Sequence, residues 1–366
     1  MPQNSRGLFD IAMTETAEKP DILSLLPEEL EAELAALGQP RFRAGQVFQW
    51  LGRGVRDFDA MTNLSRDLRE TMKARFHLYQ PKVLSKQVSA IDGTIKYLWE
   101  LHDGNAVETV VMSYKHGNTV CVSSQVGCRQ GCAFCASTIG GLVRDLRASE
   151  ILDEVIFSEL DSGKKISNIV LMGIGEPLDN FDNVMRFLEL VNHPKGMNIG
   201  MRHISLSTCG IIEKFDELAA RDLQLTLSVS LHAPDDETRS RIMPANHGRG
   251  VDRLIDACRV YYEKTGRRIS FEYAMIDGVN DSPEQARKLA GHARAVSAHV
   301  NLIPLNHVEE RQFQPSTPEH MKQFIGILEE NGVNVTVRRR LGSDVDASCG
   351  QLRRKMQKEK GGHKPL

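Results

Sequence analysis

The 366-residue sequence has no apolar run near the roughly 18 residues that a membrane-spanning helix requires. Residues 1–20 are polar and lack the apolar segment of a secretory signal peptide. We therefore expect a cytoplasmic protein with no membrane partner and with residues 1–20 disordered. Cysteine is scarce, at seven residues, which argues against a disulfide framework. The sequence is 41% hydrophobic and 26% charged, enough for a large core and a smaller domain.

Net charge is also small, at −2, which argues against a uniformly basic nucleic-acid-binding protein. The charge is unevenly distributed, because residues 338–366 contain nine Lys or Arg and three Asp or Glu. A local basic patch can bind phosphates while the whole chain stays near neutral, although part of this charge is typical of a solvated tail. The candidate phosphate contacts are Arg338–Arg340 and Arg353–Lys355.

Three cysteines, Cys128, Cys132 and Cys135, lie within eight residues. Thiolates at C-x3-C-x2-C spacing can hold one face of a cube-shaped iron–sulfur cluster and leave the fourth iron open to a substrate. Structural zinc requires four ligands, usually in two separated pairs, and no second Cys or His pair lies nearby in the sequence. The spacing therefore favours a cluster over zinc.

The N-terminal part is predicted to be helical. Helices are expected over residues 26–34, 43–51 and 64–76, the last capped by Asn63 or Ser65. Residues 21–80 would form a small helical accessory domain. Residues 81–115 are predicted to form a β-rich connection with hairpin turns at Asp92–Gly93 and Asp103–Gly104. On this pattern alone Glu108 is an exposed strand carboxylate.

Between residues 116 and 345, apolar strands alternate with amphipathic helices. Strands are predicted over 119–124, 168–172, 203–207, 224–230, 269–276 and 299–304, and helices over 149–162, 180–192, 212–219, 252–264, 283–296 and 318–331. This alternation indicates an α/β fold with a parallel sheet and outer helices. Six repeats fit a partial (βα)6 barrel better than a closed eight-stranded one, with chemistry expected at the carboxyl ends of the strands.

Four of these strands end in small polar residues or glycines. After the second strand, Gly173 and Gly175 allow close approach of a ligand, and a buried Glu176 could receive an ammonium group. Each motif alone is compatible with an ordinary turn or helix cap. Four such motifs at the ends of strands that lie in the same sheet as the strand before the cysteine motif predict a ligand pocket. Cys209 and Cys258 are predicted to be buried thiols.

The cysteine motif, with Phe134 before its last cysteine, resembles that of the radical S-adenosylmethionine (SAM) superfamily. The resemblance implies one [4Fe-4S] cluster per chain, held by Cys128, Cys132 and Cys135, whose open iron binds the methionine part of SAM. Electron transfer would cleave SAM to a 5′-deoxyadenosyl radical. The same resemblance supports the partial barrel.

Further motifs resemble the dual-specificity RNA adenine C2-methyltransferases: residues 172–178 (MGIGEPL), 206–208 (LST), 230–234 (SLHAP), 301–306 (NLIPLN) and 346–352 (DASCGQL), with 42–50 and 61–65 in the helical part. The similarity covers nearly the whole chain after about residue 25. It implies that SAM is contacted by Gly175, Glu176, Ser207, Ser230, Leu231, His232 and Asn306. One departure is Cys209, where many relatives carry Ser.

Cys121 and Cys349 match the two reactive cysteines of this family, although each alone could be a packed thiol. Adenine C2 bears only hydrogen and is electron-poor, so it cannot attack a methyl group directly. The resemblance implies that one SAM methylates Cys349 and that a second SAM removes hydrogen from that methyl group, two per turnover. The carbon radical adds to C2, and Cys121 forms a transient disulfide with Cys349 to release the product. Glu108 matches the family's proton acceptor, and Cys121 is a competing candidate.

The implied substrates are an adenine of the peptidyl-transferase centre of 23S rRNA and the adenine 3′ of the anticodon in tRNAs. Either base must be accessible or flipped, and the resemblance implies that the helical domain of residues 21–80 binds RNA. A monomer and an electron donor such as flavodoxin or ferredoxin are expected. Three alternatives stay open: a C8-methylating rRNA resistance relative, a non-catalytic zinc-stabilised RNA-binding protein, and a radical enzyme that acts on proteins or metabolites. The Gly175-Glu176-Pro177 sequence favours C2.

Overall fold

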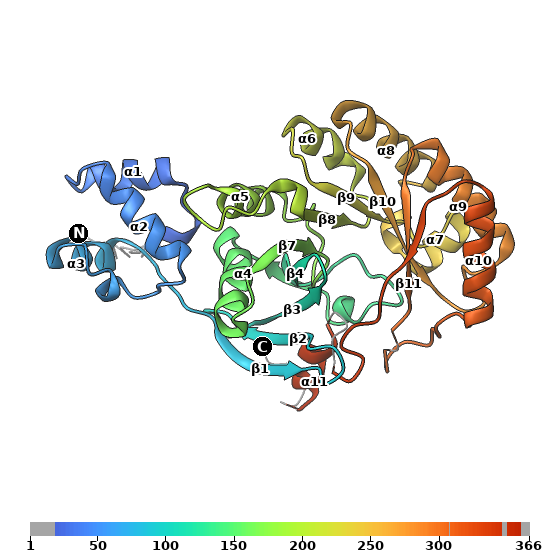
Figure 1. The fold of residues 1–366 in the computed structure, drawn as a ribbon, viewed down its shortest axis with the longest axis horizontal. Coiled ribbons are helices and arrows are strands. Elements are labelled where there is room, and N and C mark those ends of the chain that lie inside the picture. Colours follow the sequence, from blue (N-terminus) through green and yellow to red (C-terminus); the bar gives the residue numbers. More distant parts are fainter. Residues whose placement is uncertain (1–18, 307, 346–349, 360–366) are drawn as a thin grey trace, which may run out of the picture.

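The computed structural model describes residues 19–306, 308–345 and 350–359. Its main sheet has ten strands in the order β1-β2-β3-β4-β7-β8-β9-β10-β11-β12. The parallel strands are β4 (Gly117–Cys121), β7 (Ile166–Leu171), β8 (Ile204–Thr208), β9 (Thr226–Ser230), β10 (Ile269–Met275), β11 (His299–Pro304) and β12 (Val335–Val337). The sheet curves but does not close, because β1 and β12 are its two edges (Figure 1).

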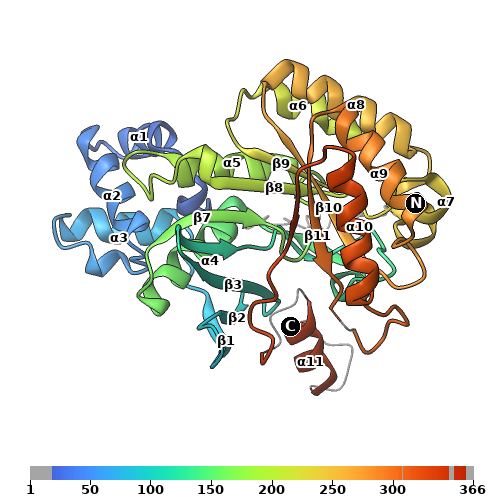
Figure 2. The same cartoon turned by 45° about the vertical axis from the view of Figure 1, so that its right-hand side comes forward.

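Helices cover the outer face of this sheet (Figures 1 and 2). They are α4 (Ala148–Ser162), α5 (Phe181–Asn192), α6 (Phe215–Ala220), α8 (Val251–Thr265), α9 (Pro283–Ala295) and α10 (Pro318–Glu330). The six predicted strands and six predicted helices are therefore present, and the α/β partial-barrel prediction is confirmed. Apolar side chains from both layers form one continuous core.

Several short elements were not predicted. They are the antiparallel pair β5 (Gln125–Gly127) and β6 (Leu142–Asp145), the helix α7 (Asp236–Ile242) and the seventh parallel strand, β12. Elements of three to seven residues are too short to show a hydrophobic period. Among the described residues there are also six 3-10 turns: η1 (Ile22–Ser24), η2 (Phe58–Ala60), η3 (Ala136–Thr138), η4 (Met201–His203), η5 (Ile212–Lys214) and η6 (Pro244–Asn246).

The N-terminal helices are α1 (Pro27–Ala36), α2 (Phe42–Gly52) and α3 (Arg66–Arg75). Ser65 caps α3, since its side chain accepts a hydrogen bond from the backbone N–H of Leu68. These helices lie at one end of the molecule, beside α4 and α5 (Figure 1). Arg186 of α5 donates both its Nη atoms to Glu29 of α1, and Arg56 forms a buried ion pair with Asp153 of α4.

Residues 82–114 form the antiparallel strands β1 (Lys82–Val88), β2 (Ile95–Glu100) and β3 (Ala106–Tyr114). These strands extend the barrel sheet, because β3 pairs with β4. The last helix, α11 (Gln351–Glu359), lies beside this extension (Figure 2). Within the described ranges, no helix is long and apolar enough to cross a membrane.

Candidate active site

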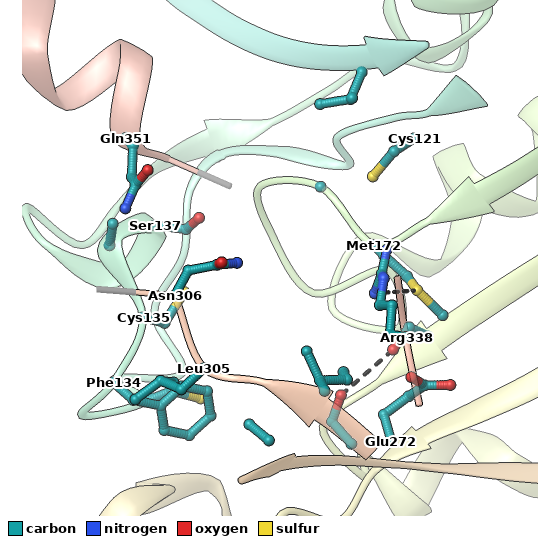
Figure 3. A pocket seen from close by; sticks show the side chains of 18 of the residues that line it. Cys121, Phe134, Cys135, Ser137, Met172, Glu272, Leu305, Asn306, Arg338 and Gln351 are labelled. Atoms are coloured by element: carbon teal, nitrogen blue, oxygen red, sulfur yellow. Dashed lines mark hydrogen bonds between the residues drawn. The ribbon is translucent and has the colours of Figure 1, made fainter. Parts of the chain in front are cut away.

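A cavity of about 630 Å³ opens at the carboxyl ends of the parallel strands. It brings together most of the predicted site residues: Cys121, Cys128, Cys132, Cys135, Gly175, Glu176, Ser207, Ser230, His232 and Asn306. Cys121 and Met172 lie on one side of the cavity, and Cys135 and Asn306 lie on the other (Figure 3). Cys349 falls outside the described residues.

The three clustered cysteines lie in the loop that joins β5 to β6. Hydrogen bonds fix the loop at its start and in its middle, from Cys128 N–H to Gly141 C=O (3.0 Å) and from Ala133 N–H to Ile242 C=O (2.8 Å). Thr138 donates its hydroxyl to the carbonyls of Cys132 and Cys135, both at 3.1 Å. These hydrogen bonds hold the backbone of the loop, and its three cysteines line the cavity.

The donor set fits a cluster. Burial, with a smaller contribution from repulsion by Cys135, raises the pKa of Cys128 to about 12, so this thiol stays protonated unless a cation replaces the proton. Within the described residues, the one trio of potential ligand atoms that lies within 4.8 Å is Asp277, Asp281 and His320. Cys128, Cys132 and Cys135 do not form such a trio, so at least one pair of their sulfurs lies more than 4.8 Å apart, beyond the roughly 3.8 Å between ligands of a tetrahedral zinc with 2.3 Å bonds. Such spacing suits a larger iron–sulfur group and disfavours the zinc alternative.

Glu176 links the ends of β7 and β8. Its carboxylate accepts the backbone N–H groups of Cys209 at 2.7 Å and Leu178 at 3.0 Å, and its own N–H donates to Gln125 Oε1 at 2.9 Å. Burial raises the pKa of this carboxyl, and the hydrogen bonds oppose that shift. A buried acid at the cavity wall can receive an ammonium group, which is the role the sequence predicts for it.

The ends of β8 and β9 contribute hydroxyls and an imidazole. Ser207 and Ser230 face each other with their Oγ atoms 3.4 Å apart. Burial lowers the pKa of His232 to about 3, with a smaller effect from Arg239, so this side chain is neutral. Its Nδ1 accepts the N–H of Ala274 at 2.9 Å, which leaves the proton on Nε2, available to donate in the cavity.

Arg239 of α7 is a fully buried cation behind this wall. It donates to the backbone carbonyls of Cys209 (2.6 Å), Leu231 (3.0 Å) and Ser230 (3.3 Å), and to Asn246 Oδ1 (2.7 Å). The guanidinium therefore holds two strand ends together. Leu231 itself is fully buried and its side chain belongs to the core rather than to the cavity lining.

Cys121 ends β4 and is 5% exposed, with its side chain at the cavity. It packs in a small apolar cluster with Val110 and Met112. Cys209 and Cys258 are buried as predicted, and burial raises the pKa of both thiols. Of the four cysteines outside the cluster motif, Cys121 and Cys209 line the cavity, whereas Cys258 lies in the core.

The expectation that Glu108 is exposed is wrong. Its side chain is buried and forms an ion pair with the fully buried Lys96 at 2.7 Å. Its carboxylate also accepts the N–H groups of Gly350 and Arg353, both at 2.6 Å. The physical reason is that α11 covers the face of β3 that sequence alternation assigns to solvent. Glu108 does not line the cavity.

The structure adds Glu272 and Arg338 to the cavity. Glu272 lies inside the barrel, where it accepts from Asn301 Nδ2 at 2.7 Å and from Ser270 Oγ at 3.1 Å. Burial raises the pKa of its carboxyl, and Arg338 opposes that shift. Arg338 itself lies against Met172 (Figure 3). The sequence feature that could have identified Glu272 as a site residue is a carboxylate within the otherwise apolar strand Ile269–Met275.

The predicted phosphate contacts separate into two groups. Arg338, Arg339 and Arg340 line the cavity, and the last two are exposed. By contrast Arg353 is buried and does not present a surface contact. Arg354 pairs with Glu310 at 3.2 Å. Lys355, in the same stretch, is exposed. Exposed basic side chains therefore lie both at the cavity rim and on α11.

The chain matches two family descriptions, the radical SAM superfamily over residues 122–290 and the ribosomal RNA large subunit methyltransferase N-terminal domain over residues 20–78. It is 50% identical over 338 residues to a probable dual-specificity RNA methyltransferase RlmN of Alkaliphilus oremlandii, covering 92% of this chain and 98% of the relative. A protein of the same description from Desulforamulus reducens is 51% identical, with 92% and 97% covered.

Among solved structures, a radical SAM methyltransferase from Sphaerobacter thermophilus matches with a TM-score of 0.86 and 43% identity, covering 91% of this chain and 98% of that one. The fold prediction is thereby confirmed as the radical SAM type. Superfamily membership implies a [4Fe-4S] cluster and SAM, which fits the three cysteines and the polar strand ends around one cavity. The chain belongs to the RlmN family of dual-specificity RNA methyltransferases, within the radical SAM superfamily.

Proposed function

We propose that this protein methylates C2 of an adenine in the peptidyl-transferase centre of 23S rRNA and C2 of the adenine 3′ of the anticodon in tRNAs. The observation that supports this most directly is the placement of Cys121 in the same cavity as Cys128, Cys132 and Cys135. A methyltransferase acting on a nucleophilic atom needs neither a cluster nor an additional thiol at the site. Carbon C2 of adenine requires both.

Cys128, Cys132 and Cys135 would hold one [4Fe-4S] cluster per chain. With SAM bound, this cofactor supplies one-electron cleavage of SAM and hence a hydrogen-abstracting carbon radical. Glu176 would bind the ammonium group of SAM, and the hydroxyls of Ser207 and Ser230 would bind its other polar groups. The Nε2–H of His232 and the amide of Asn306 would donate hydrogen bonds. Leu231 would contribute through its backbone, since its side chain is in the core.

Cys349 would carry the methyl group as S-methylcysteine, so that two SAM molecules are consumed per turnover. After the methylene carbon has bonded to C2, the adduct radical would give up one electron, for which the cluster would serve as acceptor, and the C2 proton would go to a base. The Cys121 thiolate would then attack the Cys349 sulfur. The S–C bond breaks as the S–S bond forms, the released enamine takes up a proton at its methylene carbon to give the methyl group, and the disulfide remains for an external reductant. Cys121 lines the cavity and Glu108 does not, which favours Cys121 as the acceptor of the C2 proton.

RNA would bind through the exposed Arg339 and Arg340 at the cavity rim and through the N-terminal helices, which match the family's N-terminal domain. Cation contacts of this kind give affinity and salt dependence rather than base choice. We also propose that the protein is a cytoplasmic monomer that receives electrons from a donor such as flavodoxin or ferredoxin.

Anaerobic turnover on an rRNA fragment and on tRNA tests this function, with the wild type, Cys121→Ala and Cys349→Ala. We expect 2-methyladenosine from the wild type, a covalent protein–RNA adduct from Cys121→Ala, and neither from Cys349→Ala. Mass spectrometry of the nucleosides separates C2 from C8 methylation. Activity in Cys349→Ala, or 8-methyladenosine as the product, would contradict the proposal.

A further inference from the structure

We propose that Lys96 and Glu108 form a buried anchor that fixes the chain directly after Cys349, and that both are positioning residues. The catalytic consequence of this role rests on the proposed function. The structural basis lies wholly in described residues, because Gly350 and the start of α11 are held by three separate contacts.

The first contact is the carboxylate of Glu108. The first N–H groups of a helix have no acceptor within the helix. For α11 an acceptor comes from a distant strand, since Glu108 Oε1 accepts the N–H of Arg353 and Oε2 accepts the N–H of Gly350, each at 2.6 Å. A carboxylate at a helix N-terminus also interacts favourably with the helix dipole. Glu108 therefore acts as the cap of α11.

Lys96 offsets the free-energy cost of burying the charged Glu108 carboxylate. An isolated buried carboxylate is strongly disfavoured, whereas a paired one is not. Lys96 Nζ lies 2.7 Å from Glu108 Oε2, and the lysine and glutamate side chains are 0% and 3% exposed. In the register of the two strands, Leu98 faces Glu108 and Glu100 faces Ala106. Lys96, Leu98, Ala106 and Glu108 thus share the face that α11 covers.

The second contact is apolar and lies on that face. Leu352 of α11 is buried against Leu98 and Ala106. The helix therefore packs on the β2–β3 pair as well as being capped by it. Burial of Leu352 positions the first turn of α11, and the Glu108 carboxylate then determines where that turn begins.

The third contact joins α11 to the cluster loop. Gly350 has φ +78°, and a Cβ on it would lie 2.8 Å from both the backbone N and the Oγ of Ser137. Ser137 belongs to η3, which begins directly after Cys135. Gly350 is thus held between the Glu108 anchor and the cluster loop, and the residue before it is Cys349. The anchor therefore fixes the position of the residue that directly follows Cys349.

Two roles for Glu108 make different predictions. A proton acceptor is needed only after the RNA adduct has formed, so its loss would accumulate adduct as Cys121→Ala does. A positioning residue is needed before the adduct forms. Its loss would lower adduct formation and would raise the amount of SAM cleaved per adenine methylated.

Hydrogen exchange of the full-length, cluster-loaded protein tests the anchor without any turnover. We expect amides of residues 350–356 to exchange roughly tenfold faster or more in Lys96→Met and Glu108→Gln, because charge-assisted hydrogen bonds are weakened or lost. Asp153→Asn removes another buried ion pair, which joins α4 to Arg56 and includes no residue of α11, and should leave this segment unchanged. Gly350→Ala perturbs the anchor from the Ser137 side and should also speed exchange.

The second measurement is the ratio of 5′-deoxyadenosine to methylated adenine, with the amount of protein–RNA adduct. We expect the ratio to rise at least about threefold in Lys96→Met and Glu108→Gln, with no adduct accumulation. Unchanged exchange in both variants would overturn the anchor, as would adduct in Glu108→Gln at the level of Cys121→Ala. If the wild type methylates no adenine, the proposed function fails, while the exchange result still decides the anchor.

Discussion

Replacing Gly175 by Ala tests the close contact between the loop after β7 and the residues that precede the cluster loop. A Cβ on Gly175 would lie 2.7 Å from Gln125 N, Gln125 Cβ and Ser124 Oγ. The backbone φ of +109° is one that L-residues rarely adopt. The conformation costs about 1–3 kcal/mol, and displacement of the neighbours adds about 1–3 kcal/mol. We therefore expect Gly175→Ala to lower the free energy of unfolding by about 2–6 kcal/mol.

Two matched glycines separate these contributions. Gly163, at the end of α4, has φ +65° and nothing within 4 Å of a Cβ, so Gly163→Ala should show the conformational cost alone, about 1–2 kcal/mol. Gly173 lacks a positive φ, but its Cβ would lie 2.6 Å from the carbonyl oxygen of Val122. Gly173→Ala should therefore show the steric cost alone, about 1–3 kcal/mol.

Urea unfolding followed by circular dichroism, under anaerobic conditions, measures the three variants. Equilibrium dialysis with SAM measures the consequence for the cavity, since Gly173 and Gly175 both line it. We expect Gly175→Ala and Gly173→Ala to weaken SAM binding by roughly tenfold or more, and Gly163→Ala to bind as the wild type does. A Gly175→Ala protein no less stable than Gly163→Ala, with normal SAM affinity, would refute this reasoning.

Three further predictions concern the same cavity. Arg239→Met should destabilise the fold by at least about 3 kcal/mol, because the carbonyls of Cys209, Ser230 and Leu231 lose their donor; the exposed Arg241→Met on the same helix should not, as thermal unfolding will show. The pKa of His232 is about 3 in the folded protein and 6.5 in the unfolded chain. Between pH 3 and pH 6.5, therefore, the imidazole is protonated only in the unfolded state. Stability from this group is complete above pH 6.5 and falls by up to about 1.4 kcal/mol per pH unit below it, a slope that His232→Gln should reduce in urea titrations at pH 7, 6 and 5. Cys132→Ala should lose bound iron and sulfide, measured by elemental analysis, while nitrocellulose filter binding of tRNA persists.

The cysteine motif illustrates what local sequence can determine. Cys128, Cys132 and Cys135 are close in the chain, so their spacing alone limits how far apart their sulfurs can lie. The barrel was similarly predictable, because each strand and each helix carries its own hydrophobic period. The strand ends followed from that pattern, which is why Glu176 and His232 were found before their partners were known.

Residues whose environment comes from distant segments were not predictable in this way. Glu108 lies 242 positions from Gly350, and nothing in the alternation of β3 indicates that α11 covers it. Arg353 was expected at the surface for the same reason, since a basic stretch near a terminus gives no sign of burial. Arg239 lies in a helix too short to show a period, yet it joins two strand ends.

The sequence by itself determined the chemistry and the order of the elements, because both depend on residues near one another along the chain. Only the tertiary structure decided which charges are buried and paired, because burial depends on every segment that packs against a residue. Lys96 and Glu108 are ordinary strand residues in the sequence. In the folded protein they hold the helix that follows Cys349.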